Sequence, residues 1–196
     1  MAAYEIAVVG TSWGGLAALR QLVTALPDTF ALSMVVVQHR HRDSDHLLTS
    51  LLQDRTALCV SEVEDKAPVT GGTIYLAPAD YHLLVEGGQF SLSTDEAVLY
   101  SRPSIDVTFT SVADAYGERA VGVVLTGANA DGARGLRRIA DRGGLALVQR
   151  PETAESPTMP AAALRAVPEA RVLSIAEIAS TLAALPVAQT SRSGST

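Results

Sequence analysis

Apolar runs alternate with amphipathic stretches along most of the chain. Several of the apolar runs are continuous, which is typical of parallel strands that are covered on both faces. They predict strands at Ile6–Val9, Leu32–Val37, Leu58–Val63, Val121–Leu125, Leu145–Gln149 and Arg171–Leu173. The amphipathic stretches predict helices at Gly14–Leu26, Ser44–Asp54, Ser104–Tyr116, Ala133–Arg142, Pro160–Ala166 and Ile175–Leu185. This alternation predicts an α/β fold, a doubly wound and mostly parallel sheet with helices on both faces.

One stretch departs from this rhythm. After the pair Gly71-Gly72, short strand-like segments follow at Thr73–Ala77, His82–Glu86 and Gln89–Ser93. The pair Gly87-Gly88 suits a two-residue hairpin turn. We therefore expect an antiparallel flap, a hairpin at one edge of the sheet.

Composition limits the class of protein. A chain of 196 residues with 47% apolar residues predicts one ordinary domain, which we expect over residues 1–185, followed by a disordered tail at 186–196. The net charge of −6 disfavours binding to a nucleic-acid backbone, so we expect no nucleic-acid partner. We find no basic leader and no apolar stretch long enough to span a bilayer, so we expect a cytoplasmic protein without membrane insertion. The only cysteine, Cys59, is expected to be a buried small hydrophobe, which fits a reducing compartment.

The segment from Gly10 to Gly15 carries the first candidate chemistry. It reads Gly-Thr-Ser-Trp-Gly-Gly and joins a predicted strand to a predicted helix. A serine between glycines at such a turn has the arrangement of a nucleophile elbow. Its hydroxyl lies beyond the end of the strand, where N–H groups at a helix start are available to stabilise an oxyanion.

Two further polar residues follow predicted strands. His39 comes after the strand ending at Val37, and Asp131 lies in the loop after the strand ending at Leu125. Because the carboxyl ends of parallel strands meet at one edge of a sheet, we expect Ser12, His39 and Asp131 to meet there. They would supply a nucleophile, its base and the carboxylate that orients the base. The order Ser…His…Asp differs from that of the α/β-hydrolases.

Each residue also has a structural interpretation. Ser12 would cap the helix that starts near Gly14, and Asp131 would cap the helix that starts at Ala133. His39 would be a solvated loop residue, as we expect for the nearby histidines. His82 is expected to pack or to form a hydrogen bond near the flap.

Two other kinds of site remain alternatives. Metal-type ligands gather in the stretch that holds His39, His41, Asp43, Asp45 and His46, although arginines at 40 and 42 would place positive charge beside a cation. The glycine-rich turn would instead hold a nucleotide phosphate. Its second glycine position is occupied by a serine, however, and no Gly-Lys-Ser/Thr follows.

The chain also resembles the catalytic domain of the CheB family of chemotaxis methylesterases, over about Tyr4 to Leu185. The motifs that carry the resemblance occur in one order along the chain. They are Gly-Thr-Ser-Trp-Gly-Gly at 10–15, Val-Val-Gln-His at 36–39, Tyr-Leu-Ala-Pro-Ala-Asp-Tyr-His-Leu at 75–83, Arg-Pro-Ser-Ile-Asp at 102–106, Leu-Thr-Gly-Ala-Asn-Ala-Asp-Gly-Ala at 125–133 and Glu-Ser-Pro-Thr-Met-Pro at 155–160.

The resemblance implies a doubly wound sheet with an edge hairpin and the hydrolysis of glutamate γ-methyl esters on receptor helices. Members of the family also deamidate glutamine at such sites. By resemblance, Ser12 is the nucleophile, His39 the general base and Asp131 the orienting carboxylate. The backbone N–H groups of Trp13 and Ala128 are our candidates for the oxyanion hole. The chemistry requires no cofactor and no metal, and the expected partner is a methylated, chemoreceptor-like helical protein.

Some features depart from the family pattern. Trp13 replaces a small polar residue, Ala128-Asn129 replaces Met-Gly, and Arg40 stands where Met is common. All three surround the expected site, so we expect these departures to bear on the substrate more than on the reaction type. We find no receiver domain, so we expect either a separate regulatory protein or a constitutively accessible site. Two alternative functions remain: a module that binds a receptor helix with little or no catalysis, and an esterase or amidase for a small soluble substrate.

Overall fold

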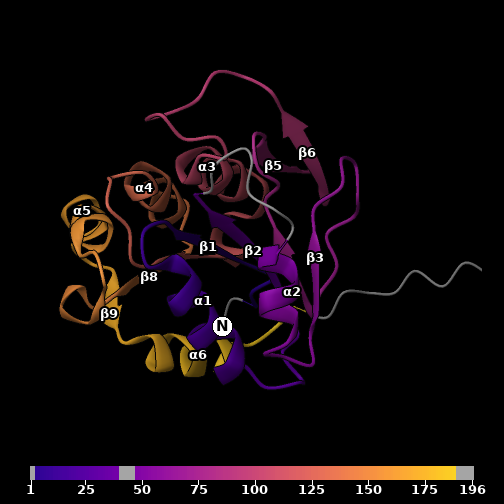
Figure 1. The fold of residues 1–196 in the computed structure, drawn as a ribbon, viewed down its shortest axis with the longest axis horizontal. Helices are drawn as coiled ribbons and strands as arrows, with labels where there is room; N and C mark the ends of the chain where they lie inside the picture. Colours follow the sequence, from indigo (N-terminus) through magenta and orange to yellow (C-terminus); the bar gives the residue numbers. More distant parts are fainter. Residues whose placement is uncertain (1–2, 40–46, 189–196) are drawn as a thin grey trace, which may run out of the picture.

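The computed structural model describes residues 3–39 and 47–188. Its main sheet has seven strands in the order β3-β4-β2-β1-β7-β8-β9, and every neighbouring pair is parallel (Figure 1). The strands are β1 (Ile6–Thr11), β2 (Ser33–Gln38), β3 (Cys59–Glu62), β4 (Thr73–Leu76), β7 (Ala120–Val124), β8 (Leu145–Gln149) and β9 (Arg171–Leu173). The predicted fold class, with its mostly parallel sheet, is confirmed.

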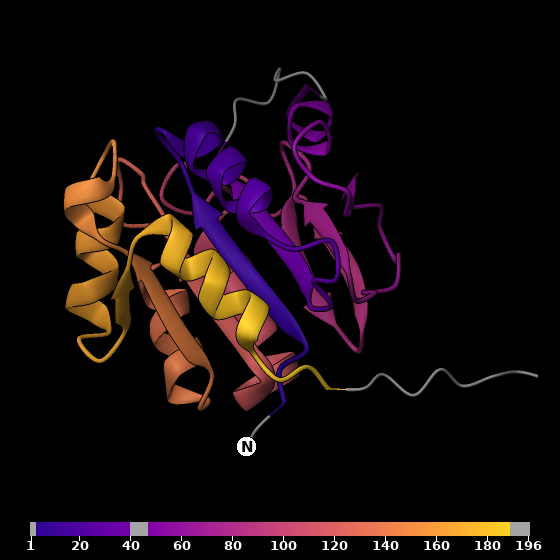
Figure 2. The same cartoon turned by 90° about the horizontal axis from the view of Figure 1, so that it is seen from below.

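Helices cover both faces of this sheet. They are α1 (Gly15–Ala25), α2 (Leu47–Gln53), α3 (Ile105–Tyr116), α4 (Ala133–Asp141), α5 (Thr158–Ala166) and α6 (Ile175–Ala184). Helices α1, α2 and α6 pack on one face, where Figure 2 shows α1 and α6 side by side, and α3, α4 and α5 pack on the other. Successive strand residues point to opposite faces, so Ala7 and Val9 join the first core while Ile6 and Val8 join the second.

The hairpin is a separate sheet of two antiparallel strands, β5 (His82–Glu86) and β6 (Gln89–Ser93). It packs on α3, where the Ser111 hydroxyl accepts a hydrogen bond of 3.0 Å from the Val85 N–H. The assignment of Thr73–Ala77 to the flap was wrong, because β4 pairs in parallel with β2 and β3 inside the main sheet.

The structure also tests the expectations for Cys59, for His82 and for the end of the domain. Cys59 is exposed rather than buried, because it begins the edge strand β3 with its side chain outward. His82 is buried, and its Nε2 lies 2.9 Å from the Glu96 carbonyl oxygen, as expected near the hairpin. Backbone pairing with Tyr4 continues through Val187 and Ala188, past the predicted boundary at 186. Residues 189–196 of the predicted tail lie outside the described residues.

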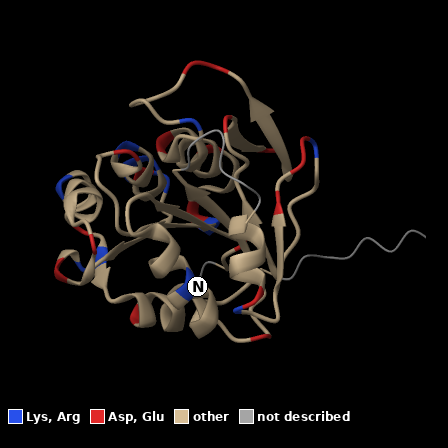
Figure 3. Ribbon diagram, in the orientation of Figure 1, with Lys and Arg blue, Asp and Glu red and all other residues tan. Residues whose placement is uncertain are grey.

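Charged residues of both signs are interspersed along the described chain (Figure 3). None of the helices in the described ranges combines the length and the apolar character that crossing a membrane would require.

Candidate active site

Ser12 stands immediately after β1, and α1 begins at Gly15. The backbone of this elbow is held from two sides. The N–H of Ser12 donates to the Thr126 carbonyl oxygen at 3.0 Å, and the carbonyl oxygen of Ser12 accepts from Gln38 Nε2 at 2.9 Å. The cap position of α1 is Gly14 and no side chain caps it, so the expected capping role of Ser12 is wrong.

Both glycines of the elbow are required by its geometry. Gly14 has a φ of 77°, and a Cβ there would lie 2.7 Å from Glu155. A Cβ at Gly15 would lie 2.0 Å from Gln38 Oε1 and 2.8 Å from Thr11 Oγ1. A larger residue at either position would therefore have to displace these side chains, and at Gly14 it would also adopt a strained backbone conformation.

His39 and Asp131 form a direct pair. His39 follows β2 directly, and its Nε2 lies 2.8 Å from Asp131 Oδ2. The histidine side chain is 11% exposed and the aspartate is fully buried. Because an ionised carboxylate only accepts hydrogen bonds, Nε2 is the donor in this pair, and in the neutral imidazole the lone pair then lies on Nδ1. Nδ1 faces Asn129 Nδ2 at 3.4 Å and Ser101 Oγ at 3.5 Å.

The N-terminus of α3 holds the Asp131 carboxylate. It accepts from the N–H of Ile105 at 2.7 Å, from the N–H of Asp106 at 2.8 Å and from the Ser104 hydroxyl at 3.0 Å. Burial raises the pKa of Asp131, but the hydrogen bonds from His39 and from these backbone groups outweigh it, so the pKa lies below its ordinary value. The carboxylate therefore stays ionised and faces the positive end of a helix.

The expectation that Asp131 caps the helix beginning at Ala133 was wrong. That cap position is Gly132, and Asp131 binds the start of α3 instead. Asp106 in the first turn of α3 makes the reciprocal contacts, accepting from the N–H groups of Gly132 at 2.9 Å and Gly135 at 2.7 Å. Each helix start is thus bound by a carboxylate from the other segment, and this exchange fixes Asp131 in place.

Ser12 and His39 line the same two hollows at the carboxyl ends of the strands. One hollow, of about 580 Å³, also contains Trp13 and Ala128, and the other, of about 700 Å³, contains Asn129. Within the described residues the Ser12 hydroxyl forms no hydrogen bond, so the serine–histidine contact of a working triad is not made in this state. Such contacts are often long in free enzymes and tighten when substrate binds.

The expected oxyanion donors line the first of these hollows. Within the described residues, the backbone N–H groups of Trp13 and Ala128 donate to no other group. The neighbouring N–H groups are engaged, that of Ser12 by Thr126 and that of Gly127 by the Ser156 carbonyl oxygen at 3.1 Å. An oxyanion hole requires N–H donors that are free of other acceptors and close to the serine hydroxyl, so both groups stay candidates for that role.

The metal alternative concerns mainly residues 41–46, which lie outside the described residues. Across the ranges that the structure does describe, His, Cys, Asp and Glu side chains form no cluster suited to a metal ion. His39 is instead paired with Asp131.

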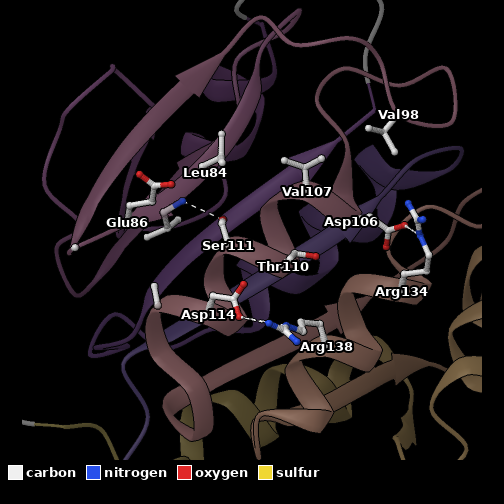
Figure 4. Close-up of a pocket in the computed structure, with 13 residues that line it drawn as sticks. Leu84, Glu86, Val98, Asp106, Val107, Thr110, Ser111, Asp114, Arg134 and Arg138 are labelled. Carbon is white, nitrogen blue, oxygen red and sulfur yellow. Dashed lines mark hydrogen bonds and ion pairs between the residues drawn. The ribbon is translucent and has the colours of Figure 1, made fainter.

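A larger hollow of about 840 Å³ lies between the hairpin, α3 and α4 (Figure 4). Four of the charged groups that line it form two ion pairs: Arg134 binds Asp106 at 3.0 Å and Arg138 binds Asp114 at 2.7 Å. None of Ser12, His39 and Asp131 lines it, so its size does not make it the reacting site.

Sequence reasoning assigned no role to Ser104, Asp106, Gln38 or Thr126, which hold the site together. Ser104 and Asp106 lie in the Arg-Pro-Ser-Ile-Asp motif, which contributes to the family resemblance but indicates no individual role for either residue. An acidic residue in the first turn of a buried helix was the available signal.

Comparison with known proteins agrees with this geometry. The catalytic domain of CheB methylesterase from Thermotoga maritima superposes with a TM-score of 0.87 at 30% identity, covering 93% of this chain and 98% of that one. A relative from Leptospira interrogans is 43% identical over 90% of this chain and 92% of its own length. Protein-glutamate methylesterase/protein-glutamine glutaminase 1 of Carboxydothermus hydrogenoformans is 36% identical over 92% of this chain and 55% of its own length. The model of the CheB methylesterase family matches residues 7–182, and the chain belongs to that family.

Proposed function

We propose that this protein is a protein-glutamate methylesterase that acts on γ-methyl esters in chemoreceptor-like helical proteins. Ser12 is its nucleophile, His39 its general base and Asp131 the carboxylate that orients the base. The observation that carries the proposal is the pair of His39 Nε2 and buried Asp131, 2.8 Å apart, beside hollows that His39 shares with the elbow serine. The names of the relatives support the choice of substrate.

The chemistry follows from the proton positions. With the Nε2 proton donated to Asp131, the lone pair of Nδ1 takes the proton of the Ser12 hydroxyl as the oxygen attacks the ester carbonyl. The carbonyl oxygen becomes an oxyanion, which the N–H groups of Trp13 and Ala128 stabilise. His39 returns the proton to the leaving methoxide, and methanol departs. Water then enters, loses a proton to His39 and cleaves the acyl-enzyme to free glutamate and serine.

The same route serves glutamine, because an amide differs only in its leaving group. Protonation by His39 would release ammonia in place of methanol, and the remaining acyl-enzyme would be identical. The exposed free thiol of Cys59 supports action in a reducing compartment, which is the cytoplasm in our proposal.

Release of methanol from a methyl-labelled receptor fragment tests the proposal. Wild-type protein should release label, and Ser12→Ala should lose about 10³-fold or more of the rate while melting at the wild-type temperature. Ser180→Ala makes the same chemical change on the exposed face of α6 and should keep full activity. Binding of the fragment without turnover would favour the module alternative, and turnover of small esters alone would favour a soluble substrate.

A further inference from the structure

Residues 98–101 form a tight turn beside the candidate active site. Val98 and Ser101 exchange backbone hydrogen bonds of 3.1 and 2.9 Å. Leu99 and Tyr100 occupy the two central positions with φ of 48° and 64°. A turn with positive φ at both central residues strongly favours Asn-Gly or Gly-Gly, because a side chain is strained there.

The same chain supplies a matched comparison. The turn between β5 and β6 also has two central residues with positive φ, and they are Gly87 and Gly88, with φ of 56° and 78°. At Leu99 and Tyr100 the strain is not offset by burial, because Leu99 is 49% exposed and Tyr100 is completely exposed. Strain that nothing within the described chain compensates is typical of a functional segment.

The turn lies beside the candidate active site. Leu99 and Tyr100 line the hollow of about 700 Å³ that also contains Ser12 and His39. Ser12 also lines the hollow of about 580 Å³, to which the exposed residue Trp13 contributes. Exposed apolar side chains thus line both of the hollows that contain Ser12, and a substrate that reaches Ser12 has to enter these hollows.

We propose that the Leu99–Tyr100 turn is a substrate-recognition surface for apolar side chains that lie one helical turn from the esterified glutamate. The proposal rests on the function proposed above. On a helix, residues three or four apart are neighbours on one face, with Cβ atoms about 5–6 Å apart. A glutamate ester that reaches Ser12 therefore brings such neighbours to the rim, where exposed Leu99 and Tyr100 bind them.

The test uses two versions of a methylated helical receptor fragment. In one version the residues one turn before and after the ester are leucine, and in the other they are serine. Wild-type protein should prefer the leucine fragment by at least about tenfold in kcat/KM. The double variant Leu99→Asn/Tyr100→Gly installs a favoured turn, so it should melt a few degrees higher and lose most of this preference. N-acetylglutamate γ-methyl ester, which has no helical neighbours, should be hydrolysed at the same rate by both proteins.

Val172→Ser is the matched control. It removes an exposed apolar side chain on the edge strand β9, away from both hollows, and it should leave the preference intact. Equal preference in wild type and double variant overturns the inference, as does a parallel loss of activity on the small ester, which would make the turn a support for the site. If wild type hydrolyses none of the esters, the proposed function itself fails.

Discussion

Replacement of Asp131 by asparagine probes the contact on which the proposed site depends. The carboxylate accepts at both oxygens: Oδ2 from His39 at 2.8 Å and the N–H of Ile105 at 2.7 Å, and Oδ1 from Ser104 at 3.0 Å and the N–H of Asp106 at 2.8 Å. An amide has only one oxygen. In either orientation its NH₂ group therefore faces one of the two backbone N–H donors at the start of α3.

The energetic cost follows from this count of donors. A buried donor left without an acceptor costs about 1–3 kcal/mol, and loss of the negative charge at a helix N-terminus costs about 0.3–2 kcal/mol. We expect Asp131→Asn to lower the free energy of unfolding by about 2–4 kcal/mol. For a chain of this size that corresponds to a melting temperature about 4–16 °C lower, measured by calorimetry or circular dichroism.

Asp131→Asn should also lower the rate of methanol release, by more than its effect on stability would explain. With the amide NH₂ toward His39, Nε2 must accept a hydrogen bond, so the imidazole proton moves to Nδ1 and the base that serves Ser12 is lost. We expect kcat for methanol release to drop about 10³- to 10⁴-fold. Asp114→Asn removes an exposed carboxylate of α3 that pairs with Arg138, and it should cost no more than about 1 kcal/mol and no activity. Wild-type stability and turnover in Asp131→Asn would refute the reasoning.

Three further predictions use the same framework. Because the pKa of Asp131 is lowered in the folded protein, its contribution to stability is complete above its ordinary value of 3.8 and is lost as pH falls through the folded value. The gap in unfolding free energy between wild type and Asp131→Asn should therefore narrow below about pH 4 in urea titrations. Asp106→Ala leaves the buried N–H groups at the start of α4 without an acceptor and should cost about 2–4 kcal/mol, whereas Asp106→Asn keeps one acceptor and should cost less than half as much in the same titration. Gly10→Ala places a Cβ 2.4 Å from Ile105 Cγ2, so chemical denaturation should show a loss of about 1–3 kcal/mol and the ester assay a reduced rate.

The parallel strands were predictable because burial on both faces leaves a continuous apolar run. Thr73–Ala77 shows the limit of that signal. Its composition suits a hairpin arm as well as an interior strand, and only its pairing with β2 and β3, which are distant in the chain, decides between them. Cys59 was misjudged for a related reason, since an apolar neighbourhood does not reveal which side of an edge strand is left uncovered.

The sequence predicted which residues lie together at the edge of the sheet, but not the hydrogen bonds that hold them there. Ser12, His39 and Asp131 each follow a strand of a parallel sheet, and topology alone brings such positions to one edge. The capping partner of Asp131 was mistaken because the local sequence places a helix directly after it, whereas the carboxylate reaches the helix that starts at Ile105. That choice depends on how α3 and α4 pack against each other, which no local pattern encodes.

The backbone and the ring of His39 are held by different parts of the fold. Its backbone N–H donates to the Thr11 carbonyl oxygen at 3.1 Å, so the pairing of β1 with β2 sets its distance from the neighbouring Ser12. Its ring is held at Nε2 by Asp131, so the packing of α3 against α4 sets the ring orientation. Because the Ser12 side chain takes part in neither contact, Ser12→Ala should leave the His39–Asp131 pair unchanged. A shift of the histidine ring resonances in that variant comparable to their shift in Asp131→Asn would show that the serine helps to hold the pair.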